Sequence, residues 1–99
     1  MKENKMQITK NQNLSKVDEK FYELKKNKKL ALIPFIVAGD PNIEKTSEIL
    51  LNLQENGADL IEVGIPYSDP LADGPIIQFS AARALKSGTT PSKVIKLTL

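Results

Sequence analysis

The sequence predicts an α/β chain with parallel strands, because apolar runs of the strand type alternate with segments of helical periodicity. The first apolar run is Leu30 to Ala38 and the second is Ala58 to Ile65. Sheets of parallel strands occur almost only inside larger α/β folds, so we expect a (β/α)₈ (TIM) barrel of roughly 250 residues. A doubly wound sheet is the alternative, but no Gly-rich nucleotide-binding turn follows the first run.

Helices are predicted by capping residues and by apolar residues that share one face. Ser15 and Asp18 resemble a capping box, and the helix that they open should end near Lys28. Thr90 is placed to cap a later helix that has proline at its first position. Two further helices are expected from apolar stripes that end at glycine, Ile43 to Gly57 and Ile77 to Gly88.

These elements amount to an N-terminal helix and about the first two β/α units of a barrel. We therefore expect residues 15–99 to be the N-terminal part of a single, incomplete domain and residues 1–14 to be a flexible extension. Pro34 conflicts with a central strand, since proline cannot donate to the ladder. Phe35 and Asp40, in and after the same run, are expected to have core and turn roles.

Composition narrows the chemistry and the partners. The chain has no cysteine and no histidine, so neither a thiolate metal site nor a histidine base is available. Nine lysines against four acidic residues make residues 1–29 basic, but without a stacking pattern of aromatics, so we expect a solvated surface rather than nucleic-acid binding. No apolar stretch is long enough to span a membrane.

The amino-acid composition suggests a source compartment. Lysine far outnumbers arginine and asparagine is frequent, which is typical of AT-rich genomes such as those of plastids or endosymbionts. We expect a soluble protein of the plastid (chloroplast) stroma if an algal plastid encodes it, and a cytoplasmic protein otherwise.

Candidate chemistry concentrates between residues 59 and 78. Glu62 interrupts the second apolar run, and Gly64, on the same strand face, leaves room above it. If the apolar neighbours pack against helices, Glu62 points into the barrel, where a buried carboxyl group suits general acid/base catalysis. A structural acid paired inside the barrel is the alternative.

Two more acids, Asp69 and Asp73, lie in the proline-rich loop after that run. Turn formation explains both of them, and Asp73 is also placed to cap the next helix. The prolines stiffen this loop at the catalytic end of a barrel strand, however, and a stiff loop can hold a carboxylate in place.

The run EVGIPYSDPLADGP, residues 62–75, closely resembles the corresponding part of tryptophan synthase alpha chains. The segments IPFIVAGDP, residues 33–41, and NGAD, residues 56–59, carry the same resemblance. It implies a TIM-barrel lyase of tryptophan biosynthesis that cleaves indole-3-glycerol phosphate to indole and glyceraldehyde 3-phosphate, with no cofactor in this subunit. It also implies a partner beta chain, which uses pyridoxal phosphate, in a tetramer of two alpha and two beta chains. The family has proline at the position of Pro34, which removes the objection to a strand there.

Residue by residue, the resemblance implies that Glu62 is the catalytic acid/base and that Asp73 accepts a hydrogen bond from the indole N–H. Phe35 matches an aromatic residue that lines the indole pocket. Three residues fall in the loop that contacts the beta chain: Pro66, Asp69 and Pro70.

Two other functions stay open. Another TIM-barrel enzyme acting on a sugar phosphate would keep the fold but should lack the ADGP segment at residues 72–75. A non-catalytic interaction fragment would tolerate loss of Glu62. The family's phosphate-binding and lid residues fall beyond residue 99, so the 99 residues alone are expected to be inactive.

Overall fold

The computed structural model describes residues 15–69 and 72–99, and the chain divides into two compact units, Met1–Leu32 and Ile33–Leu99. The first unit contains helix α2, Lys16–Lys26. The backbone N–H of Asp18 donates to the Ser15 hydroxyl, and the N–H of Ser15 donates to the Asp18 carboxylate, both at 3.2 Å. The predicted capping box is confirmed. The helix ends two residues before Lys28, which adopts a φ of 55°.

The second unit contains a parallel sheet formed by β1, Phe35–Val37, and β2, Glu62–Gly64. The predicted parallel pairing is confirmed, but the predicted strand lengths are wrong, since both strands are only three residues long. Pro34 explains where β1 begins, because it has no N–H to donate. Its carbonyl still accepts a hydrogen bond from the Glu62 N–H at 2.9 Å.

Helix α3, Ile43–Glu55, connects the two strands, and α4, Pro75–Lys86, and α5, Pro91–Thr98, follow β2. Thr90 caps α5 as predicted, by accepting a hydrogen bond from the Lys93 N–H at 3.3 Å. Gly57 and Gly88 follow the ends of α3 and α4 with φ of 100° and 91°, a left-handed conformation that favours glycine. The predicted ends of both helices are confirmed.

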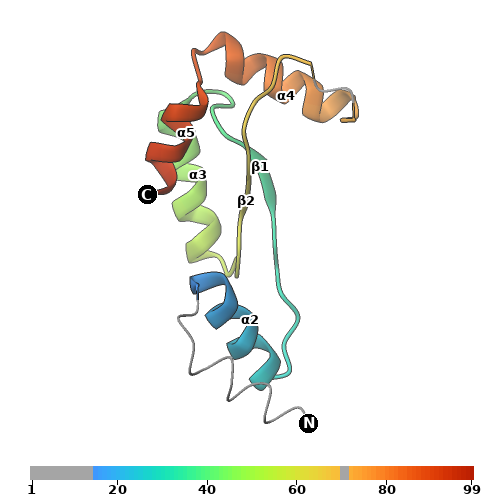
Figure 1. The fold of residues 1–99 in the computed structure, drawn as a ribbon, viewed down its shortest axis with the longest axis vertical. Coiled ribbons are helices and arrows are strands. Elements are labelled where there is room, and N and C mark those ends of the chain that lie inside the picture. The colour runs from blue at the N-terminus through green and yellow to red at the C-terminus, as the bar shows by residue number, and fades with distance from the viewer. Residues whose placement is uncertain (1–14, 70–71) are drawn as a thin grey trace. The chain divides into compact units, whose positions relative to one another are not determined.

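Helix α4 lies across the carboxyl ends of the strands and contacts β1, whereas α5 packs beside α3 (Figure 1). The helices that connect the strands of a (β/α)₈ barrel form an outer ring. We assign α3 and α5 to adjacent positions in that ring. The sequence predicts a helix over residues 77–88 but does not predict where that helix lies. In the structure it is α4, an additional helix over the carboxyl ends of the strands. Its residues Ile77, Ala81 and Ala84 pack on Val37 of β1.

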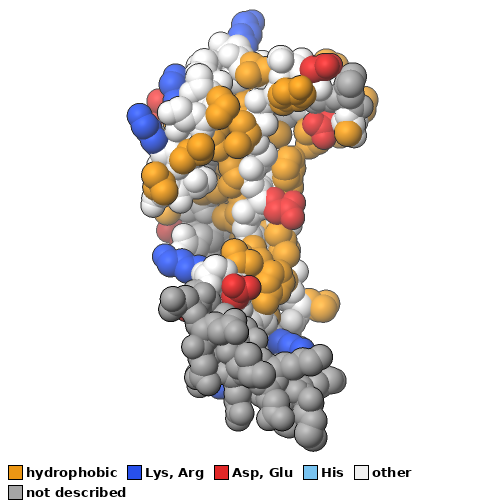
Figure 2. All heavy atoms as spheres, viewed as in Figure 1, with side chains coloured by type: hydrophobic (Ala, Val, Ile, Leu, Met, Phe, Trp, Pro, Cys, Tyr) orange, Lys and Arg blue, Asp and Glu red, His pale blue; other side chains and the backbone are white. Residues whose placement is uncertain are grey.

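Large apolar side chains of Ile33–Leu99 remain exposed, and Figure 2 shows many of them on one face. On α4, Ile76 is 80% exposed and Phe79 is 66% exposed. Among the described residues of this unit, the buried apolar ones are few and small, and they include Ala38, Ala81 and Ala84. Burying the exposed side chains requires further strands and helices, as expected for one part of a barrel.

Candidate active site

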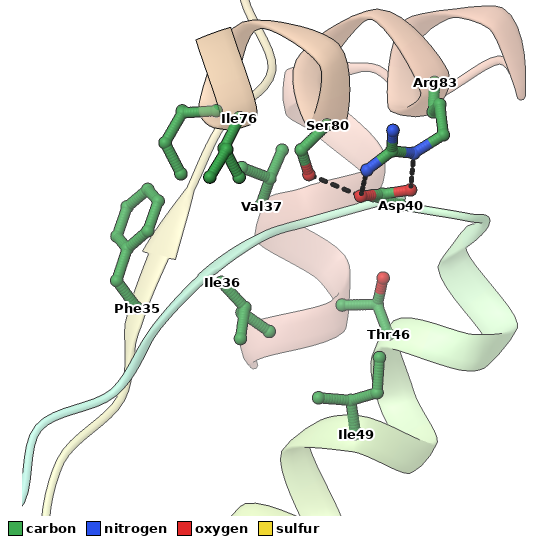
Figure 3. A pocket seen from close by; sticks show the side chains of 10 residues that line it. Phe35, Ile36, Val37, Asp40, Thr46, Ile49, Ile76, Ser80 and Arg83 are labelled. Atoms are coloured by element: carbon green, nitrogen blue, oxygen red, sulfur yellow. Dashed lines mark hydrogen bonds and ion pairs between the residues drawn. The ribbon is translucent and has the colours of Figure 1, made fainter. Parts of the chain in front are cut away.

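Glu62 and Phe35 are direct neighbours across the two strands. Residues in register on parallel strands point to the same face, and here that face also carries Val37, which packs on α4. Figure 3 shows Phe35 and Val37 on the α4 side of β1, and Ile36 on the side of α3. The structure therefore brings the predicted acid/base and the predicted aromatic contact together.

Gly64 has a steric role beside this pair. A Cβ added at Gly64 would lie 2.7 Å from Cζ and 3.1 Å from Cε1 of Phe35. The ring of Phe35 thus occupies the space that the missing side chain leaves. The sequence predicts room above Glu62 at Gly64, and in the structure the ring of Phe35 fills that room.

The expected burial of Glu62 and the expected core position of Phe35 are not found. Glu62 is exposed, and 47% of Phe35 is exposed. The physical reason is that residues facing into a (β/α)₈ barrel are enclosed by all eight strands, whereas the sheet described here has two.

Asp73 lies at the end of the loop that follows β2. The N-cap of α4 is Gly74, which makes no side-chain capping hydrogen bond, so the prediction that Asp73 caps this helix is wrong by one position. The backbone carbonyl of Asp73 accepts a hydrogen bond from the side-chain amide of Gln78 at 2.7 Å. The Asp73 side chain is exposed.

The residues expected to contact a partner differ in their surroundings. Pro66 is buried, which leaves little of its surface for a partner, whereas Asp69 is exposed. Pro70 lies outside the described residues.

A cluster of three side chains that sequence analysis did not predict joins the end of β1 to α4 (Figure 3). Arg83 donates to both carboxylate oxygens of Asp40, from Nε at 2.8 Å and from Nη2 at 2.9 Å, and the Ser80 hydroxyl also donates to Asp40. The hydrogen bond from Arg83 lowers the pKa of Asp40 below its ordinary value, although burial opposes this and raises it. A usable signal was present, because Arg83 is the only arginine in a chain rich in lysine.

A cavity of about 280 Å³ lies between β1, α3 and α4. Its lining is mostly apolar and includes Phe35, and Asp40 and Arg83 also line it (Figure 3). Glu62 and Asp73 do not line this cavity, so the three predicted site residues do not share it. Within residues 15–69 and 72–99, no group of three acidic side chains is placed to hold a metal ion. In the same ranges, every helix is too short or too polar to cross a bilayer.

Parallel strands with an acidic residue on β2, and others after the carboxyl ends of both strands, are the arrangement expected in a (β/α)₈ barrel, a class whose active sites lie at that end. Comparison with known proteins identifies the family. The family model for the tryptophan synthase alpha chain matches residues 21–99, and the chain belongs to this family. The predicted family and the predicted barrel fold are confirmed.

Individual relatives show the extent of the match. The tryptophan synthase alpha chain of Prochlorococcus marinus subsp. pastoris is 74% identical over 98 residues, which are 98% of this chain and 35% of that relative. The structure of tryptophan synthase subunit alpha from Legionella pneumophila str. Paris has a TM-score of 0.83 and 40% identity, and covers 85% of this chain and 32% of its own. Tryptophan synthase from M. tuberculosis, in an aminoacrylate-bound form, has a TM-score of 0.79 and 33% identity over 85% of this chain and 34% of its own. The chain thus spans about a third of the length of the relatives it matches.

Proposed function

We propose that this chain supplies the acid/base part of a tryptophan synthase alpha subunit, a carbon–carbon lyase that cleaves indole-3-glycerol phosphate to indole and glyceraldehyde 3-phosphate. The observation that carries the proposal is the family match over residues 21–99, which includes every proposed site residue. Residues 15–99 then form the first part of a single barrel domain, and residues 1–14, which lie outside the described residues, form an extension.

Glu62 is the proposed acid/base. Retro-aldol cleavage needs a proton delivered to the indole carbon that leaves and a proton removed from a substrate hydroxyl, and one mobile carboxyl group can do both. The N–H of Glu62 donates to the carbonyl of Pro34, the residue before β1, and the register places Glu62 on the sheet face that carries Phe35. This combination of a fixed backbone and a carboxyl group beside an aromatic ring supports the role.

Asp73 and Phe35 are the proposed substrate-binding residues. Protonating the ring carbon places positive charge on the indole N–H group, which a carboxylate that accepts its hydrogen bond stabilises. Asp73 supplies that carboxylate from the loop after β2. The ring of Phe35 offers an apolar surface for the indole, on the same sheet face as Glu62.

The proposed partner is the tryptophan synthase beta chain, in a tetramer of two alpha and two beta chains. The alpha subunit needs no cofactor of its own, since pyridoxal phosphate acts in the beta chain. Asp69, together with Pro66 and Pro70, belongs to the proposed contact loop. The Prochlorococcus relative favours the cytoplasm over the plastid stroma as the compartment. Neither nucleic acid nor a membrane is a proposed partner.

The test is indole formation from indole-3-glycerol phosphate by the full-length gene product. A second arm uses a chimera in which the present chain replaces the matching segment of the Prochlorococcus relative. Both proteins should release indole, Glu62→Gln should abolish release, and Glu55→Gln, on the exposed end of α3, is the matched control. Indole release that survives Glu62→Gln would refute the assigned role. A full-length protein without lyase activity would favour a different barrel enzyme or a non-catalytic fragment.

A further inference from the structure

We propose that Asp40, Ser80 and Arg83 form a positioning cluster that holds α4, and with it Asp73, over the sheet face that carries Glu62. The inference rests on the proposed function, because it assigns these three residues a part in the same reaction. None of the three is proposed to touch the substrate. Their effect on catalysis acts through the placement of Asp73.

The turn that carries Asp40 is fixed to the end of β1. The N–H of Gly39 donates to the buried Thr46 hydroxyl at 2.8 Å, and the Ser87 hydroxyl donates to the Gly39 carbonyl at 3.1 Å. Gly39 has a φ of 90°, and a Cβ there would fall 1.9 Å from Oγ1 of Thr89. Because the turn is packed this closely, the backbone of Asp40 has little freedom to move at the end of β1.

The contact with α4 has a geometry that lysine cannot supply. Arg83 donates two N–H groups in one plane to the two oxygens of Asp40, a bidentate arrangement specific to the guanidinium group. All other basic residues of the chain are lysines, so the single arginine stands where the bidentate contact forms. The Asp40 side chain is 17% exposed, so water screens it less than the partners of an ordinary surface pair such as Lys45–Glu48.

Asp73 is connected to α4 as closely as Asp40 is. Only Gly74 separates it from the first residue of the helix, and the Gln78 side chain of the first turns donates to its carbonyl. Glu62 is connected to β1 by different contacts, the hydrogen bonds of the parallel ladder between β1 and β2. Both acids are therefore positioned relative to β1. Glu62 is positioned through the strand ladder, and Asp73 is positioned through α4 and the Asp40–Ser80–Arg83 cluster.

A purely structural ion pair would also join β1 to α4, and a double-mutant cycle separates the two roles. The cycle measures kcat and KM for indole formation by the full-length protein, with Arg83→Ala, with Asp73→Ala and with both. Arg83→Lys is the conservative variant, and Glu48→Ala, which breaks the exposed Lys45–Glu48 pair, is the matched control. Thermal unfolding of each variant fixes an assay temperature at which all are folded, and Ser80→Ala replaces Arg83→Ala should the latter not fold.

We expect Arg83→Ala to lower kcat/KM by at least about tenfold, with a raised KM, since displacing a group by ~1 Å can cost 10²-fold. Arg83→Lys should recover part of the loss and Glu48→Ala should change nothing. In the Asp73→Ala background the loss should shrink to about twofold or less, because coupled residues are not additive. An equal loss in both backgrounds, or no loss at all, overturns the positioning role alone. A wild-type protein that forms no indole overturns the proposed function and this role with it.

Discussion

Replacing Gly64 by alanine should damage catalysis far more than folding. The added Cβ would lie 2.7 Å from Cζ of Phe35, whereas carbon atoms in contact are about 3.5–4.0 Å apart. The ring must therefore retreat by about 1 Å. The atoms that the new Cβ would meet, Cζ and Cε1, lie at the far end of the Phe35 side chain, so the ring can move without displacing β1, and no left-handed φ adds strain at Gly64.

The expected loss follows from that displacement. A misplacement of ~1 Å is worth roughly 10²-fold in rate, or about 2.7 kcal/mol of transition-state stabilisation. The assay compares kcat/KM for indole formation by the full-length wild type and Gly64→Ala. Gly74→Ala is the matched control, because a Cβ there meets nothing within 4 Å and its φ is −74°.

A second variant tests whether the collision with Phe35 is the cause. Leucine at position 35 lacks the outer ring atoms that the new Cβ would meet. If the collision matters, Gly64→Ala should cost little more in a Phe35→Leu background than Phe35→Leu costs alone. A loss of similar size in both backgrounds, or a loss for Gly74→Ala equal to that for Gly64→Ala, would refute the reasoning.

Four other outcomes are expected. Asp73→Asn should retain more indole formation than Glu62→Gln, since asparagine still accepts a hydrogen bond whereas glutamine cannot shuttle a proton; equal residual rates would show that the roles are misassigned. Asp40→Asn should destabilise the full-length protein at neutral pH and flatten its acid unfolding curve. The pKa of Asp40 is lowered from 3.8, so its contribution to the free energy of unfolding is present above that value and lost as the pH falls through the lowered pKa; urea titrations that give parallel pH curves for both proteins would contradict this. Asp69→Ala should reduce the stimulation of indole formation by saturating beta chain more than it reduces the basal cleavage rate. Unchanged stimulation would show that the loop has no role in communication between the subunits. The 99 residues alone should show no cooperative thermal transition and no lyase activity, because a two-stranded sheet leaves unpaired edges; a sharp transition in calorimetry would argue otherwise.

Sequence patterns predict the helices well because caps and end glycines act within a few residues. Ser15 and Thr90 cap their helices through hydrogen bonds to N–H groups three residues ahead, and Gly57 and Gly88 end theirs through their own φ. None of these features needs a distant partner. They can therefore be predicted from the local sequence.

Strand lengths and the place of α4 could not be predicted in the same way. A strand ends where its ladder ends, so the last residue of β1 depends on β2, twenty-seven positions along the chain. The place of α4 depends on Arg83 and Asp40, which are 43 positions apart. An apolar run or a helical stripe holds no information about such partners, although the single arginine was a clue.

The candidate site combines residues that were predicted with geometry that was not. The sequence predicts Glu62 as a site residue because an acidic side chain in an apolar strand is costly to bury unless it has a function. The register that places Phe35 beside Glu62, and the position of the Phe35 ring against Gly64, are seen only once the strands are paired. Asp73, eleven positions after Glu62, is connected to β1 through α4 and Arg83 rather than through the sheet. A change in β1 should therefore disturb both acids together, whereas a change at Arg83 should disturb Asp73 and leave the acid/base in place.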